Sequence, residues 1–246
     1  MLRHACCSFR RISMFVVIFL CLTPSAFAAS KIKYTQGSYL EIDAVNMENT
    51  QEISLSSETD YDDVAFKNKP SGSGNGYGLS YKYAFSAKDA LVYPFSRMFL
   101  APGIFYEDAE STSQDYFGDR FTIGNRYGAK LDMGWDFDYG IATYAAFGYS
   151  SIKYDVSATN FDDFDLHESD PNQIVRRTSI SGTSYAPFYG LGLAYSPFKH
   201  ITLNLEYNYQ KNIIDTAPES GSPTVVFLNK IINKSQIVKF GVAYHF

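Results

Sequence analysis

Residues 201–209 read Ile-Thr-Leu-Asn-Leu-Glu-Tyr-Asn-Tyr, so that every odd position is apolar or aromatic and every even position is polar. A period of two is the pattern of a β-strand with two different faces. Residues 236–246 repeat it. One face carries Val238, Phe240, Val242, Tyr244 and Phe246, and the other carries Lys239, Gly241, Ala243 and His245. The two runs predict a hairpin at the carboxyl end of the chain.

The composition of the two faces indicates what each face meets. In a soluble β-sandwich the apolar face would be an aliphatic core and the polar face would meet water. Here the apolar face is aromatic at its ends, and the other face mixes charged residues with glycine and alanine. That mixture fits a narrow lumen on one side of the sheet and lipid on the other. The hairpin therefore predicts a transmembrane β-barrel.

The first 28 residues have the features of a secretory signal peptide. Arg3, Arg10 and Arg11 precede an apolar run at 14–22, and the segment ends in the small-x-small site Ala26-Phe27-Ala28. The apolar run is too short for a membrane-spanning helix. We therefore exclude residues 1–28 from the fold.

The rest of the composition excludes several classes of protein. The three cysteines, Cys6, Cys7 and Cys21, all lie in the signal segment, which excludes a disulfide scaffold. Without that segment the chain has 18 basic residues (21 less three arginines) against 26 acidic ones, a net charge of −8 that argues against a nucleic-acid partner. No other apolar run approaches a spanning helix, so a membrane crossing would use strands.

We expect eight strands, and the length of each is close to the about 9–11 residues that a tilted membrane strand requires. In the segment 121–135 we expect Phe121 and Ile123 to face outward and all charges to face inward. The segment 97–107 is apolar on both faces and contains Pro102, so its register stays open. A ten-stranded barrel is the alternative. The expected strands lie at 37–46, 76–85, 97–107, 121–135, 139–149, 184–195, 201–209 and 236–246.

The connections between these segments alternate in length. Short links, such as 136–138 and 196–199, alternate with long polar connections at about 47–75, 108–120, 156–183 and 210–235. This alternation predicts an outer-membrane barrel with both termini in the periplasm and four long extracellular loops. Aromatic residues concentrate at both ends of the outward face, which we interpret as two girdles at the membrane interfaces.

The whole chain after the signal resembles the small eight-stranded surface barrels of Gram-negative bacteria, the opacity-protein and outer-membrane-protein-A-like group. Its last residues, Tyr244 and Phe246, look like the signal that the barrel-assembly machinery reads in that group. The resemblance implies contact with outer-membrane lipid and lipopolysaccharide, and a host or cell-surface receptor for the loops. It implies an adhesin, surface antigen or envelope-stabilising protein, with a narrow porin-like channel as the alternative. We rank an outer-membrane lipid-modifying or proteolytic enzyme below both.

Eight charged residues occupy alternating strand positions that we expect to face the lumen. Because an eight-stranded barrel is only wide enough for side chains to fill, we expect these opposite charges to pair. They would form a structural plug, which we favour, or a gated ion path. Lys239 should pair with Glu206 on one neighbouring strand and with Glu41 and Asp43 on the other. The eight residues are Glu41, Asp43, Lys82, Arg126, Lys130, Asp132, Glu206 and Lys239.

The loops offer only weak candidates for chemistry. The triplet His167-Glu168-Ser169 resembles the His-x-Ser of outer-membrane lipid deacylases but lies off any expected strand, and the acidic runs 58–63 and 162–165 lack the spacing of a calcium loop. We therefore expect no enzyme activity, no cofactor and no metal site. The apolar run Val225-Val226-Phe227-Leu228 is a candidate contact surface in the last loop, unless it simply extends the last strand.

Overall fold

The computed structural model describes residues 36–56, 67–87, 95–114, 120–137, 140–161, 175–215 and 227–246. The signal segment, the triplet 167–169 and both acidic runs lie outside these ranges. Among the described residues, no helix is long and apolar enough to cross a membrane. The elements are β1 (Gly37–Ser56), β2 (Lys67–Asn68), β3 (Ser71–Ser86), the short 3₁₀ turn η1 (Phe95–Arg97), β4 (Met98–Ala109), β5 (Ser111–Gln114), β6 (Arg120–Asp136), β7 (Ile141–Phe161), β8 (Val175–Phe198), β9 (Ile201–Asp215) and β10 (Phe227–His245).

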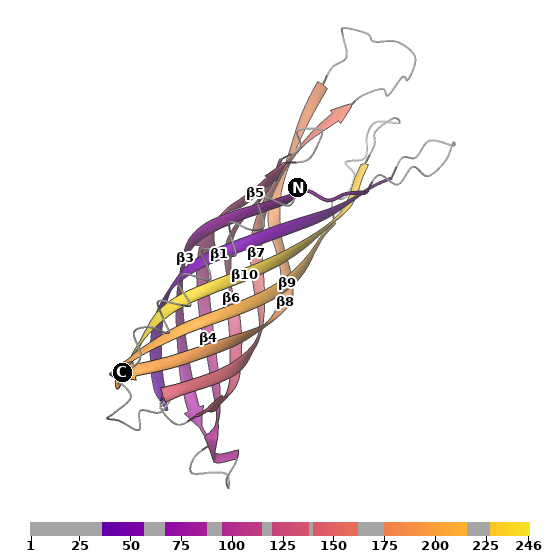
Figure 1. Ribbon diagram of the computed structural model, residues 1–246. Helices are drawn as coiled ribbons and strands as arrows, with labels where there is room; N and C mark the ends of the chain where they lie inside the picture. Colours follow the sequence, from indigo (N-terminus) through magenta and orange to yellow (C-terminus); the bar gives the residue numbers. More distant parts are fainter. Residues whose placement is uncertain are drawn as a thin grey trace, which may run out of the picture.

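The strands form one antiparallel sheet that closes on itself (Figure 1). The order β1-β10-β9-β8-β7-β6-β4-β3 is closed by the pairing of β3 with β1. The two-residue β2 lies beside the far end of β1, and β5 continues β4 after Glu110, so the wall consists of eight strands. The predicted eight-stranded up-and-down barrel is confirmed, and each of the eight expected segments is a strand.

Side chains alternate between lumen and exterior, as the period of two predicts. On β1, Ile42 is 64% exposed while its neighbour Glu41 is 3% exposed. Exposed aromatic side chains lie at several heights along the outer face of the barrel. Phe85, Tyr244 and Phe246 lie close to one end, whereas Tyr77, Tyr149, Tyr185 and Tyr207 lie further along their strands. The two girdles therefore stay a prediction.

The first part of β6 corrects the sequence prediction. Phe121 and Ile123 are 1% and 2% exposed and belong to the lumen, although the alternation predicted that they would face outward. The register between β6 and β7 shifts between Ile123 and Arg126. An irregularity of this kind moves all residues beyond it to the opposite face. From Arg126 onward the predicted parity is correct.

Most strands run further than expected at one end of the barrel. We call the end that carries Gly37 and His245 the turn end and the opposite end the extended end. There β7 and β8 pair as far as Phe161 with Val175, and β1 continues to Ser56, so much of each range expected to be a loop is strand. Figure 1 shows the β7–β8 hairpin rising beyond the other strands.

The apolar run in the last connection is partly strand as well. Val225 and Val226 lie outside the described residues. Phe227 and Leu228 open β10 and pair with Ser56 and Leu55 of β1. The alternative that the last strand extends is therefore correct for these two residues, although their neighbour is β1.

The closed wall predicts how the purified protein should behave. In detergent it should give a β-sheet circular dichroism spectrum and migrate faster on a gel before boiling than after it. The reason is that a closed barrel has no free edge within its wall from which to unravel. A helical spectrum, or identical migration of boiled and unboiled samples, would contradict the closed barrel.

Candidate functional site

The lumen is filled in layers that alternate between apolar and polar side chains. The inward residues of β1 read, from the turn end, Tyr39, then Glu41 and Asp43, then Val45 and Met47, then Asn49 and Gln51, and all seven are buried. The inward face of β10 gives the same order, with Ala243, Lys239, Ile237, and then Ser235 and Asn233. Beyond the charged layer the two strands match residue by residue, since Met47 pairs with Ile237, Asn49 with Ser235 and Gln51 with Asn233.

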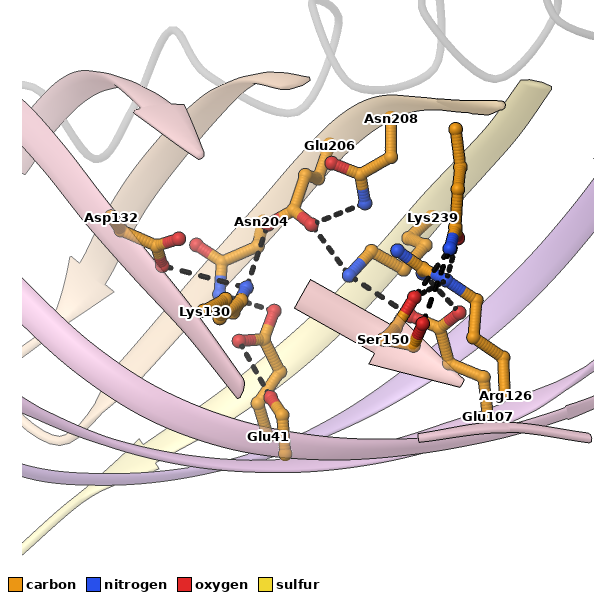
Figure 2. Close-up of polar contacts among 12 residues, drawn as sticks. Glu41, Glu107, Arg126, Lys130, Asp132, Ser150, Asn204, Glu206, Asn208 and Lys239 are labelled. Carbon is orange, nitrogen blue, oxygen red and sulfur yellow. Dashed lines mark hydrogen bonds and ion pairs between the residues drawn. The ribbon is translucent and has the colours of Figure 1, made fainter. Parts of the chain in front are cut away.

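The charged layer is one continuous chain of eight alternating charges, all of which except Lys82 are labelled in Figure 2. Each charge lies within ion-pair distance of the next, so that cations and carboxylates alternate along the lumen. In order, the chain runs Glu41–Lys82 (3.3 Å), Lys82–Asp132 (3.4 Å), Asp132–Lys130 (3.4 Å), Lys130–Glu206 (2.8 Å), Glu206–Lys239 (2.5 Å), Lys239–Glu107 (3.2 Å) and Glu107–Arg126 (2.7 Å).

Glu206 is the centre of this chain. Its Oε2 accepts hydrogen bonds from Lys130 Nζ at 2.8 Å and from the Tyr144 hydroxyl at 3.0 Å. Its Oε1 accepts one from Asn208 Nδ2 at 2.7 Å and pairs with Lys239. Figure 2 shows the carboxylate between the two lysines. Four donors from four strands therefore meet at one carboxylate, which joins the two halves of the network.

Arg126 closes the chain on the side of the extended end. Its guanidinium packs against the rings of Phe105 and Phe188, 4.7 and 4.3 Å from their centroids, and these two rings contact each other edge-to-face. Its Nη1 donates to Glu107 at 2.7 Å, and its Nε donates to Gln210 Oε1 at 2.8 Å and to Ser150 Oγ at 3.1 Å. A planar cation that stacks and donates in several directions suits this position better than an ammonium would.

All eight residues expected in the lumen are buried there, and seven of them join the chain of charges. Asp43 is the exception. It lies beside Glu41, where Gly241 leaves room for both carboxylates, and among the described residues no ion pair to it is found. Lys239 pairs with Glu206 as expected, but its second partner is Glu107, not Glu41 or Asp43.

Glu107 is the residue that sequence reasoning missed. It lies on β4, the strand whose two faces both looked apolar. The structure shows that Leu100, Ile104 and Tyr106 face outward, which places Phe105 and Glu107 in the lumen. The signal was present in the residue type, because a carboxylate in the membrane-spanning part of a strand favours the inward face.

Apolar clusters lie on both sides of the charged layer. Toward the turn end, Tyr39, Phe99 and Tyr144 pack among small residues, with the Phe99 ring against Gly134 and the Tyr144 ring against Gly192. A side chain at either glycine would collide with the ring, so the pairs are matched in size. Toward the extended end lie Val45, Met47, Ala109, Ile123, Ile152 and Ile237.

Polar contacts return beyond the second apolar cluster. In the lumen, Gln51 Nε2 donates to Asn233 Oδ1 at 3.2 Å, and Ser113 Oγ donates to Gln51 Oε1 at 2.7 Å. On the outer surface, Glu52 pairs with Lys234 at 2.8 Å and with Lys69 at 3.2 Å. Hydrogen bonds from Lys234 and then Lys69 hold the pKa of Glu52 below its ordinary value. These contacts join β1 to its neighbours at the extended end.

The chain belongs to the family of outer membrane protein beta-barrel domains, whose model matches residues 15–246. No curated protein sequence matches it. Among solved structures it is similar to Ail, the attachment invasion locus protein of Yersinia pestis (14% identity, TM-score 0.43, covering 86% of this chain and 100% of that one). It is also similar to Neisserial surface protein A (16%, 0.44, 85% and 97%) and to OprG from Pseudomonas aeruginosa (13%, 0.46, 86% and 96%). The protein is thus a small outer-membrane barrel.

Proposed function

We propose that this outer-membrane barrel is a non-conducting surface protein that acts through its extended end, as an adhesin, surface antigen or envelope-stabilising protein. The observation that carries the proposal is the layered lumen. A hydrated ion would have to pass two apolar clusters and a chain of charges that are already paired with one another. In this reading the charges are a plug that holds the strands together, and the loops and strand extensions carry the function.

The length of the strands supports an active extended end. At a rise of about 3.3 Å per residue and a tilt of about 40°, the 24 residues of β8 extend roughly 60 Å, against a lipid-facing band about 25 Å tall. The outer face of the extension is polar, with Lys153 and Asp155 on β7 and Ser179, Ser181 and Thr183 on β8. A polar face of this kind belongs in water.

The orientation of the barrel completes the proposal. With both termini in the periplasm, the turn end faces inward and the extended end lies outside the cell. The exposed rings of Tyr244 and Phe246, at the end of β10, are 5.1 Å apart. They would then lie at the inner interface, where they could serve as the assembly signal.

Deletion of the hairpin tip tests the proposal. Ser157 and Ser179 are register partners, so residues 158–178 can be replaced by a two-residue Asn-Gly turn without disturbing the ladder below them. We expect the shortened barrel to insert and to keep its heat-modifiable migration. Cells that display it should lose attachment to cultured epithelial cells and to immobilised matrix proteins. Undiminished attachment would remove this hairpin from the functional surface.

The start of β10 is the second candidate contact surface. We expect the double variant Phe227→Asp, Leu228→Asp to insert normally but to attach more weakly in the same assay, because two carboxylates would oppose contact with an apolar partner. Val225 and Val226 adjoin this segment in the sequence. Full attachment by the inserted double variant would leave the β7–β8 hairpin as the remaining candidate.

A narrow channel is the second candidate function, since the middle of the lumen is charged. Five carboxylates, counting Glu107 and Asp43, stand against four cations, and a network of ion pairs can exchange partners. A conducting barrel would need the apolar clusters to separate as well. The conductance of the protein distinguishes the two candidates.

A further inference from the structure

Strand β8 has a neighbour on only one side over half of its length. It pairs with β7 from Val175 to Tyr195, but its pairing with β9 begins only at Phe188 with Gln210. Within the part of the chain that the structure describes, residues 175–187 therefore form a sheet edge. Figure 1 shows the β7–β8 ribbon rising apart from β9 and β10.

Side-chain contacts take the place of backbone pairing where β8 and β9 separate. Pro187 has no N–H to donate to a neighbouring strand. Gln210 Nε2 donates to the Ala186 carbonyl at 3.2 Å and to the Ser150 carbonyl at 3.4 Å. Just above, Ser184 Oγ donates to the Ile213 carbonyl at 3.3 Å and accepts from Asn212 Nδ2 at 3.2 Å. Specific contacts thus replace the backbone ladder where it ends.

The middle of the β8 edge lacks the protection against pairing that Arg176, Arg177 and Pro187 give to its two ends. Natural edge strands carry lysine, proline or a bulge that prevents another strand from docking. Residues 178–186 read Thr-Ser-Ile-Ser-Gly-Thr-Ser-Tyr-Ala, without charge or proline. Its inward side is apolar, because Ile180 pairs with Val156 and the Tyr154 ring covers Gly182. An amphipathic strand is the partner that fits this edge.

We propose that the edge of β8 binds the same edge of a second copy, antiparallel and centred on Ile180. In this register residues 177–183 of the two copies pair, Ser179 lies opposite Ser181, and Ile180 lies opposite its counterpart. Arg177 falls opposite the uncharged Thr183 in this register. The edge is therefore complementary to itself, as a two-fold interface requires.

The direction of the strands decides where the two copies lie. In every copy β8 runs from the extended end toward the turn end, so two barrels side by side in one membrane would present parallel edges. An antiparallel pair requires barrels that face each other from two membranes. This step rests on the proposed placement of the extended end outside the cell, and it makes the partner of that end a second copy on a neighbouring cell.

Cysteine cross-linking tests the pairing directly, because the chain beyond residue 28 contains no cysteine. Ile180→Cys in the purified full barrel should give a disulfide-linked dimer on a non-reducing gel, since detergent lets copies meet in either orientation. Ser157→Cys is the matched control. It lies on β7 at the same height but has β6 and β8 on its two sides. Equal dimer formation by both variants, or by neither, would overturn the proposal.

A charge exchange tests the register on cells. Ser179→Lys with Ser181→Lys places like charges opposite each other and should abolish the clumping of cells that display the protein. Ser179→Lys with Ser181→Glu places opposite charges together and should preserve it. Clumping that both variants retain, or both lose, would overturn the inference. If pairing fails while deletion of 158–178 still abolishes attachment, the proposed function survives without this partner.

Discussion

Replacing Lys239 by alanine should lower the free energy of unfolding by about 3–5 kcal/mol, the range for breaking a buried ion pair on one side. Lys239 lies 2.5 Å from Glu206 and 3.2 Å from Glu107, and it is buried. Without it, two carboxylates in the middle of the barrel share the remaining cations. Denaturant titration of the refolded barrel, followed by the shift between its folded and unfolded gel bands, measures the change.

Lys234→Ala is the matched control for this experiment. Lys234 lies on the same strand but faces outward and pairs with the exposed Glu52, so its loss should barely move the unfolding midpoint. An unchanged midpoint for Lys239→Ala would show that the charges do not hold the barrel together. If that variant instead gained conductance without losing stability, the channel interpretation would be favoured.

Replacing Arg126 by alanine should have a similar effect, about 3–5 kcal/mol, because it leaves a space beside two rings and removes a partner of Glu107. Arg126→Lys separates the contributions. Lysine keeps the charge but cannot pack flat against Phe105 and Phe188 while donating to Glu107 and Gln210. We expect an intermediate loss of stability from the same titration. A lysine variant as stable as the original protein would show that the guanidinium geometry contributes nothing.

The alternation of residues predicted the barrel and most of the lumen. On β1, β9 and β10 the polar residues on the inward parity, such as Glu41, Glu206 and Lys239, are buried in the structure. The prediction worked because within the membrane a charged side chain is tolerated only on the face toward the lumen. It failed for Phe121 and Ile123, since an irregularity after Ile123 changes the parity. Gly124 and Asn125, a polar residue on the outward parity, were the local signal of this irregularity.

The extended end was underestimated for a different reason. Beyond the membrane both faces of a strand can be polar, so the contrast that reveals a strand disappears. Asn49, Gln51, Asn233 and Ser235 are buried lumen residues of long strands, yet they read as loop residues. The ion-pair partners also could not be derived from parity. Parity gives the face of Glu107, but only the registers of β4, β6 and β10 bring it to Arg126 and Lys239.

Single-channel recording of the refolded barrel in a planar lipid bilayer tests most directly whether the lumen is closed. A verified porin in the same bilayer confirms that insertion can be detected, and the gel shift confirms that the barrel is folded. Because apolar clusters lie on both sides of a chain of charges that pair with one another, we predict insertion without discrete current steps. Reproducible steps from the folded, unmodified protein would contradict the closed lumen.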